Sequence, residues 1–229
     1  MNILLILLYV YSLDKLAIFL YSKYGPSTLQ VPANVRWFFI HSFTNMLVCY
    51  QGFPSLCFCL NNIQTCATTP IDKKGQTALY TAVLLHVYHV VFFTKHLTYN
   101  DYIHHGFMLG ISGPLSLLYP NRLVVMGLWF MSGLPGMIDY FLLWCVKMKW
   151  LDTITEKYIY TFITMFVRSP GCLFSCFIAI PSLINPSWTG GYVAMVLNAM
   201  LTFWNGQYYA MLTCSDYGSK IERVKCNAN

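Results

Sequence analysis

Charged residues are scarce in this sequence. Asp, Glu, Lys and Arg supply 10% of its 229 residues, whereas soluble proteins carry about 25%. Hydrophobic residues reach 57%, and the mean hydropathy is +0.52. This composition argues against a soluble globular domain and predicts an integral membrane protein in which one helical domain uses most of the chain.

The sequence also lacks a basic stripe of the kind that binds nucleic acids. Its net charge is +6, but the Lys and Arg residues are scattered over short segments between apolar runs. No nucleic-acid recognition motif accompanies them. We therefore expect no nucleic-acid partner, and the positive charge instead favours anionic lipid headgroups.

Paired CxxC motifs, a common sign of a structural zinc site, are absent as well. Among the nine cysteines, Cys57 and Cys59 are separated by one residue, and Cys172 and Cys176 lie one helical turn apart in an apolar run. Most of the cysteines are expected to pack as small apolar residues against helices or lipid. Cys226, in the polar C-terminal stretch, carries a weak palmitoylation signal.

The sequence does contain a series of apolar runs near the ~20 residues that a membrane-spanning helix needs. These runs predict an all-α, polytopic membrane bundle of about seven transmembrane helices. The predicted spans are residues 1–22, 36–60, 76–95, 102–119, 122–147, 157–184 and 189–212. The chain then divides into an N-terminal helix and loop (1–34), a membrane domain (35–212) and a polar cytosolic tail (213–229).

The ends of the first run and the distribution of Lys and Arg predict the orientation. The first run resembles a signal peptide, but no Lys or Arg precedes its apolar core and no small-residue cleavage site follows it, so a retained span is preferred. With seven spans, nine Lys and Arg residues fall on the side of the C-terminus and three on the other side. Basic residues are enriched in cytoplasmic segments, which predicts a cytosolic C-terminus.

Five of the six histidines fall in one stretch of twenty residues: His86, His89, His96, His104 and His105. On a helix, the first two of these share a face at i and i+3, and the last two share another face with Asp101. Ionisable groups within membrane spans usually face a cavity or each other. The two faces are therefore predicted to meet if the short link between them lets the helices pack antiparallel.

The pair His104–His105 is the candidate catalytic group. Histidine titrates near neutrality, so it can serve as a general base or a nucleophile. Asp101, three residues before His104, is placed to hold one of its ring nitrogens. His86 and His89 are candidate substrate-binding residues. The alternative is a structural group of interfacial histidines that hydrogen-bond to loops or headgroups.

Histidines at helical spacing can also ligate one metal ion. The membrane di-iron oxidases and desaturases use about eight histidines, and this chain has six, one of them distant. A single zinc site or a bis-histidine haem is an alternative on ligand types alone. The preferred expectation is that no metal is bound.

Asp139 and Arg168 form a second constellation, because each lies within a predicted span beside a Pro–Gly break. Broken helices in a membrane are tolerated where protein or a cavity surrounds the freed backbone groups. The two charges predict either an ion pair across the bundle or a clamp for a substrate or headgroup. Asn205, an amide inside the last span, is expected to find a partner and is a further candidate for substrate binding.

At these residues the sequence resembles the TLC-domain family, the group of translocation-associated membrane proteins, ceramide synthases and neuronal ceroid-lipofuscinosis proteins. The resemblance covers residues 35–212 and rests on the segments LTYNDYIHHGFM, SGLPGMIDY and FVRSPG. It implies six helices around a central, lipid-accessible cavity, often with an extra N-terminal span. It also implies residence in the endoplasmic reticulum or a related membrane, and work on lipids.

The chain departs from the ceramide-synthase subgroup of that family. The pattern HHxxT fails at Met108, and the pattern HDxxD fails at Pro135 and Gly136, so ceramide synthesis is not implied. A second similarity, to the HxxHH box of fatty-acid elongases, stops at Val90, where the box has its third histidine.

Two functions follow as hypotheses. The first is a lipid-modifying enzyme, of acyltransferase type or in sphingolipid-related chemistry, for which an acyl-CoA co-substrate is the candidate acyl donor. The second is a non-catalytic protein that binds, senses or transports lipids and so regulates membrane composition. Membrane lipids are the expected partners in both cases, and a homo-oligomer is compatible with either. The two differ in whether the histidine pair opens onto a lipid-sized cavity.

Overall fold

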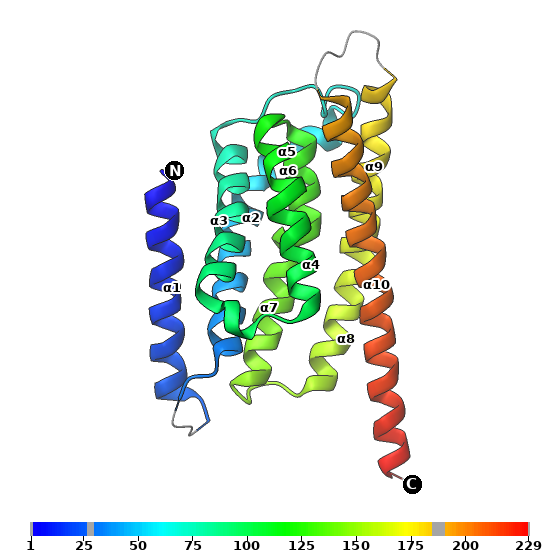
Figure 1. The fold of residues 1–229 in the computed structure, drawn as a ribbon. Helices are drawn as coiled ribbons and strands as arrows, with labels where there is room; N and C mark the ends of the chain where they lie inside the picture. The colour runs from blue at the N-terminus through cyan, green and yellow to red at the C-terminus, as the bar shows by residue number, and fades with distance from the viewer. Residues whose placement is uncertain (1, 27–29, 185–190, 229) are drawn as a thin grey trace.

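The computed structural model describes residues 2–26, 30–184 and 191–228, and this part of the chain is all-helical (Figure 1). Its helices include five stretches that are long and apolar enough to cross a membrane: Ile3–Tyr24, Ala33–Asn61, Lys73–His96, Arg122–Lys147 and Thr153–Pro181. The predicted all-α class is confirmed, and the five helices are consistent with an integral membrane protein.

The helices follow the predicted spans closely. They are α1 (Ile3–Tyr24), α2 (Ala33–Asn61), α3 (Lys73–Phe93), α4 (Tyr99–Phe107), α5 (Gly113–Leu118), α6 (Arg122–Leu128), α7 (Leu134–Lys147), α8 (Thr153–Ile163), α9 (Ser169–Leu183) and α10 (Tyr192–Ala228). Residue 1 of the first predicted span and residues 189–190 of the last lie outside the described residues. Polar N-caps begin several helices, as Asp72 does for α3 and Asp152 for α8.

The C-terminal segment differs from the prediction of a separate polar tail. α10 continues without interruption through residues 213–228 and projects beyond the rest of the bundle (Figure 1). Asp216 stabilises this extension, since it pairs with Lys220 one turn later at 3.2 Å and with Lys157 of α8 at 3.1 Å. The change in polarity therefore marks a change of environment within one helix, not the end of the helix.

Three π-helical turns precede proline residues, and two of them replace the helix breaks expected at Pro135 and Pro170. They are Met108–Ser112 (η2), Trp129–Gly133 (η3) and Thr164–Arg168 (η4), and each is followed within two residues by Pro114, Pro135 or Pro170. Proline has no N–H to donate, so a wider turn absorbs the missing hydrogen bond. The backbone N–H after each turn donates five residues back, as Ser169 does to the Thr164 carbonyl. As a result, α4–α5, α6–α7 and α8–α9 run on as continuous helical stretches.

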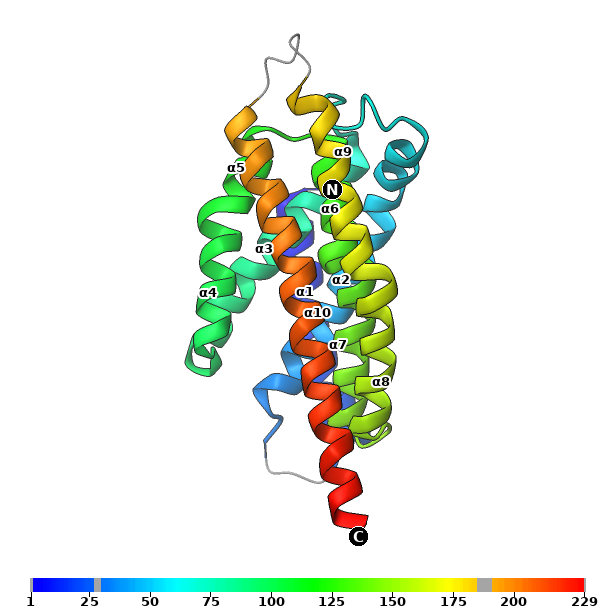
Figure 2. The ribbon, with the colours of Figure 1, turned by 90° about the vertical axis from the view of Figure 1, so that its right-hand side faces the viewer.

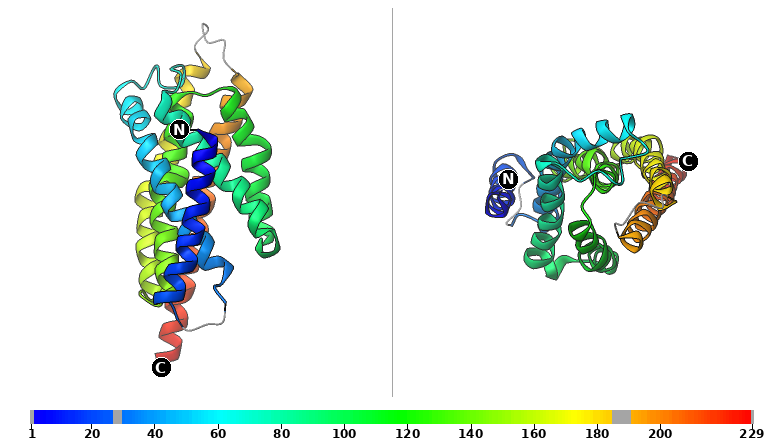
Figure 3. Two further views of the ribbon diagram at one scale, coloured as in Figure 1. Left: turned by 90° about the vertical axis from the view of Figure 1, so that its left-hand side faces the viewer. Right: turned by 90° about the horizontal axis from the view of Figure 1, so that it is seen from above.

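Helix α2 is the centre of the packing and contacts α1, α3, α6 and α7. α2 and α7 approach closely at Asn45 and Gly136, where a Cβ on the glycine would lie 2.6 Å from the Asn45 Nδ2. Seen from above, α1 stands at the outside of the bundle (Figure 3, right). It packs on α2 and α3 through an apolar cluster that includes Ile6, Val10 and Phe39.

The turn after α2 contains a disulfide that the sequence analysis did not predict. Cys59 and Cys66 are bonded, while the other seven cysteines are free. This turn lies at the end of the bundle opposite the C-terminus (Figure 1). It is fastened to the start of α6, because the Arg122 N–H donates to the Thr69 carbonyl and the Arg122 guanidinium pairs with Asp72 at 3.2 Å.

Candidate functional site

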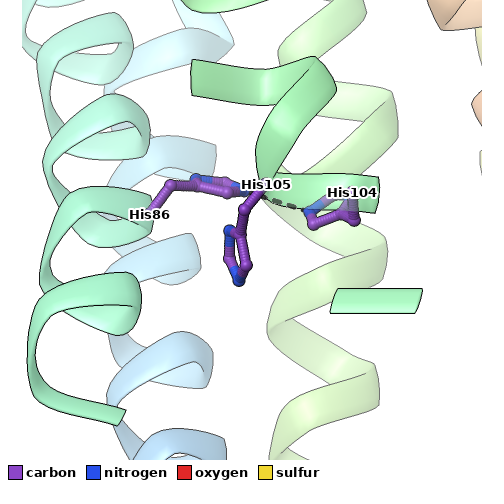
Figure 4. Close-up of side chains that lie close together, drawn as sticks. All are labelled: His86, His104 and His105. Atoms are coloured by element: carbon purple, nitrogen blue, oxygen red, sulfur yellow. Dashed lines mark hydrogen bonds between the residues drawn. The ribbon is translucent and has the colours of Figure 1, made fainter. Parts of the chain in front are cut away.

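Three helices bring five histidines together in the interior. His41 comes from α2, His86 and His89 from α3, and His104 and His105 from α4. The Nε2 atoms of His86 and His104 are 3.2 Å apart (Figure 4). The ring centroids of His89 and His105 are separated by 4.9 Å, and those of His41 and His89 by 4.8 Å. The two histidine faces noted in the sequence thus point toward each other, and His41 extends the group.

The turn between α3 and α4 sets this geometry. A 3-10 turn, Thr94–His96 (η1), follows α3 and leaves His96 exposed, away from the cluster. Thr98 then begins α4 with a capping box in which the Asp101 carboxylate accepts hydrogen bonds from the Thr98 N–H and hydroxyl, each at 2.7 Å. This capping orients the whole helix so that His104 and His105 face α3.

Asp101 therefore has a different place from the one predicted. Its carboxylate is used at the helix N-terminus, and no hydrogen bond links it to a histidine in the described ranges. The physical reason is the sequence Thr-x-x-Asp, which favours reciprocal capping over contact with a side chain one turn later. Asp101 positions the histidines through the helix that it caps.

The role predicted for Asp101, holding a ring nitrogen of His104, is taken by His86. A backbone carbonyl can only accept, so the contact of 2.7 Å between His86 Nδ1 and the Ala82 carbonyl places a proton on Nδ1. The neutral ring then offers a lone pair at Nε2, and His104 donates to it through its own Nε2–H. This arrangement leaves the Nδ1 of a neutral His104 unprotonated and able to accept a proton.

Several ring nitrogens of the cluster have no partner within the part of the chain that the structure describes. They are both nitrogens of His89 and the Nδ1 of His105, and both side chains are about 6% exposed. By contrast, His41 Nδ1 donates to the Trp37 carbonyl at 2.8 Å. Buried polar atoms without partners are costly. These three nitrogens are therefore available for a further interaction.

A cavity of about 920 Å³ lies beside the cluster. This volume is at the upper end of the range of about 300–1,000 Å³ found for small-molecule sites. Its walls come from α4 with η2, from α9 and from α10, and Figure 2 shows α4 and α5 to one side of α10 with α8 and α9 on the other. Most of the lining is apolar, and it includes Phe107, Met131, Ile180, Met200, Phe203 and Leu212.

Polar groups are few in this cavity. His104 lines it together with Asn100 and Asn205, whereas His86, His89 and His105 do not. One member of the predicted pair His104–His105 therefore opens onto a lipid-sized space, and the other faces the interior of the cluster. A long apolar ligand in the cavity would meet the imidazole of His104.

A second polar network borders the same cavity around Arg168, which ends the π turn η4. Its Nη1 donates to the Tyr160 hydroxyl at 2.6 Å, and its Nη2 donates to the Asn205 Oδ1 at 2.7 Å. The guanidinium also lies 4.4 Å from the ring centroid of Tyr209. Asn205 and Tyr209 both line the cavity. The partner expected for the Asn205 amide is thus Arg168.

No direct ion pair joins Asp139 and Arg168 in the described segments. The Asp139 carboxyl instead interacts electrostatically with Arg168 and with Tyr160, which itself hydrogen-bonds to the guanidinium. The sequence analysis did not predict that Tyr160 would interact with both charges, because a tyrosine in a predicted span is usually interpreted as an interfacial anchor.

His41 was also missed as a member of the site. Its signal was present in the sequence, since it is an ionisable residue within a predicted span. It lies 45 residues before His86 in the chain, and helical periodicity relates residues of one helix only. The packing of α2 against α3 is what places it there.

Comparisons of the chain with protein-family models, with curated proteins and with solved structures find no match. The resemblance to the TLC-domain family therefore rests on the sequence segments alone.

Proposed function

We propose that this chain is a multi-pass membrane protein of the TLC type that acts on lipids. In this proposal the five long apolar helices are joined by α4–α5 and α10 to give seven transmembrane spans. The six spans from α2 to α10 form the TLC-type unit, four of them (α4–α5, α6–α7, α8–α9 and α10) line the cavity, and α1 is the additional N-terminal span. The position of α1 outside the bundle supports this arrangement (Figure 3).

The reaction that this site supports best is acyl transfer. One observation carries the proposal: His104 lies on the wall of an apolar cavity of about 920 Å³. An acyl chain would occupy the apolar part, with its carbonyl near His104. The Nδ1 of His104 would take the proton from an attacking hydroxyl or amine and pass it to the leaving group, while His86 holds the ring in place. Arg168 and Asn205 would orient the headgroup.

The acyl donor in this proposal is an acyl-CoA, and the membrane is that of the endoplasmic reticulum or a related compartment. Disulfides persist in oxidising compartments, so the Cys59–Cys66 end is assigned to the lumen. The C-terminus, at the opposite end, is then cytosolic, in agreement with the Lys and Arg distribution. His86 and His89 lie in the second half of α3, toward the cytosolic end, where a water-soluble donor arrives.

A second candidate function is non-catalytic lipid binding or transport. It is favoured by a specific observation: only one of the five clustered histidines lines the cavity, and the rest of the lining is mainly apolar. A binding protein needs such a cavity but does not need a base on its wall.

The two candidates are separated by the variant His104→Ala. We expect the purified wild-type protein to transfer acyl groups from palmitoyl-CoA to a membrane lipid extract, and the variant to lose this activity by ~100-fold or more, the usual contribution of a general base. The variant should keep its thermal stability and its co-purified lipid, measured by native mass spectrometry. His96→Ala, a change in the same stretch but at an exposed position, is the matched control.

Undiminished transfer by His104→Ala contradicts the catalytic role, and lipid binding without transfer by the wild type favours the second candidate.

A further inference from the structure

We propose that His86, His104 and His105 form a binding site for one divalent transition-metal ion, with Zn²⁺ as the best fit. One ring nitrogen of each of these residues lies within 4.8 Å of the others. The three rings converge from two adjacent helices (Figure 4). The sequence analysis preferred no metal but kept a single zinc site as an alternative, and a site for one ion needs only three histidines.

The distances fit a small ion. Zinc binds histidine nitrogen at about 2.0–2.1 Å, so two ligands at a tetrahedral angle lie about 3.4 Å apart. The Nε2 atoms of His86 and His104 are separated by 3.2 Å. The ligand atom of His105 lies within 4.8 Å of those of the other two residues, so it would have to move closer to bind the same ion. Three histidines then leave a fourth position open, as in catalytic zinc sites.

His86 is already arranged as a metal ligand. A histidine that binds a metal through one nitrogen usually donates the other N–H to a carbonyl or carboxylate, which fixes the ring. His86 does this through its Nδ1, which contacts the Ala82 carbonyl at 2.7 Å. Its Nε2 faces the Nε2 of His104 at 3.2 Å, so both nitrogens are placed on the same side for one ion.

His105 supplies an independent observation. It is buried, and its Nδ1 has no hydrogen-bond partner among the described residues. An interior nitrogen of this kind is expensive unless something binds it. An ion held between His105, His86 and His104 would give this nitrogen a partner.

The chemistry of the ligands selects the class of ion. Nitrogen donors favour zinc and its transition-metal neighbours, whereas Mg²⁺ and Ca²⁺ prefer oxygen. The Asp101 carboxylate, on the same helix as His104 and His105, is engaged in capping α4. The pair His86 and His104 does not fit a bis-histidine haem, because the two rings contact each other directly and leave no space for a macrocycle between them.

Ion binding itself does not depend on the lipid function. One consequence rests on the proposed function: in the loaded protein the ion would replace the proton shared by His86 and His104. Catalysis at the cavity wall would then rely on a Lewis acid held by His104 instead of on its free nitrogen.

The test is the metal content of the protein purified in detergent with a tag that contains no histidine. After incubation with Zn²⁺ and removal of the excess, we expect roughly one zinc ion per chain, measured by inductively coupled plasma mass spectrometry. His86→Ala, His104→Ala and His105→Ala should each lose this ion, and His96→Ala should keep it. A wild-type protein without stoichiometric zinc, or triad variants that retain it, overturns the proposal.

A second measurement uses the wild type alone, in case the triad variants do not fold. Co²⁺ bound in a four-coordinate nitrogen site gives intense visible absorption bands, and added Zn²⁺ should abolish them. Absence of these bands overturns the site. If zinc-free protein still transfers acyl groups, the metal takes no part in the reaction, and the proposed function stands. If the protein binds zinc but transfers no acyl group, the metal site stands, and the proposed function fails.

Discussion

A single buried carboxylate, Asp14, joins three helices. Its side chain in α1 accepts two hydrogen bonds from the Arg36 guanidinium of α2, at 2.7 and 2.6 Å, and one from the Tyr88 hydroxyl of α3 at 3.1 Å. The bidentate geometry makes these charge-assisted bonds strong. A charge in the middle of an apolar run is thus explained by its partners, and α1 is held to the bundle by more than apolar contact.

We predict that Asp14→Asn destabilises the protein by about 3 kcal/mol, the lower end of the cost of breaking a buried ion pair. The lower end applies because the Arg36 side chain is 29% exposed and keeps some contact with water or headgroups. Thermal denaturation in detergent measures the effect. Lys15→Gln is the control, since Lys15 is the exposed neighbour of Asp14 and forms no ion pair in the described residues. Equal destabilisation by both changes would show that the ion pair contributes nothing specific.

At the scale of elements, side-chain hydrogen bonds fix α10 to its neighbours, and two asparagines take part in them. Near its middle, Asn205 accepts from Arg168 at 2.7 Å, which is a charge-assisted bond. Two turns earlier, Asn198 accepts from the Ser112 hydroxyl at 3.0 Å, which is a neutral bond. The two side-chain amides are chemically identical, so replacing each in turn compares a charge-assisted hydrogen bond with a neutral one in the same helix.

We predict that Asn205→Ala costs about 1.5–3 kcal/mol, because it leaves a buried guanidinium short of an acceptor, whereas Asn198→Ala costs about 1 kcal/mol. Asn205→Asp should restore stability to near that of the wild type, since a carboxylate can pair with Arg168. Thermal or chemical denaturation of the three variants decides the matter. If Asn198→Ala is the more damaging change, or Asn205→Asp is as unstable as Asn205→Ala, the charged bond is not what holds α10.

The elements show what could be predicted from sequence and what could not. Apolar runs predicted the helices closely, because length and hydropathy are local properties. The proline positions predicted irregularity at Pro135 and Pro170, but the choice of a π turn over a break depends on neighbouring helices that keep the chain straight. The face shared by His86 and His89 followed from periodicity alone.

Contacts between segments far apart in the sequence could not be predicted from such local properties. The bonding of Cys59 to Cys66, the place of Tyr160 beside Asp139 and the entry of His41 into the cluster each depend on how helices pack. Asp101 shows a different failure. Asp101 lies three residues after Thr98 and three residues before His104. Spacing alone therefore does not distinguish capping of α4 from contact with the histidine, and the turn that begins α4 decides between them.

At the scale of the whole molecule, the disulfide and the polar extension of α10 lie at opposite ends (Figure 1). In the proposed orientation these two features face different compartments, because disulfides persist where the environment is oxidising and Lys and Arg concentrate on the cytosolic side. The exposed Cys226 near the C-terminus makes the orientation measurable. In sealed microsomes, a membrane-impermeant maleimide added outside should label the wild type and not Cys226→Ser, and Cys59 and Cys66 should react only after reduction and permeabilisation. Labelling of Cys226 only after permeabilisation would invert the orientation and place the histidine cluster nearer the lumen, out of direct reach of a cytosolic acyl donor.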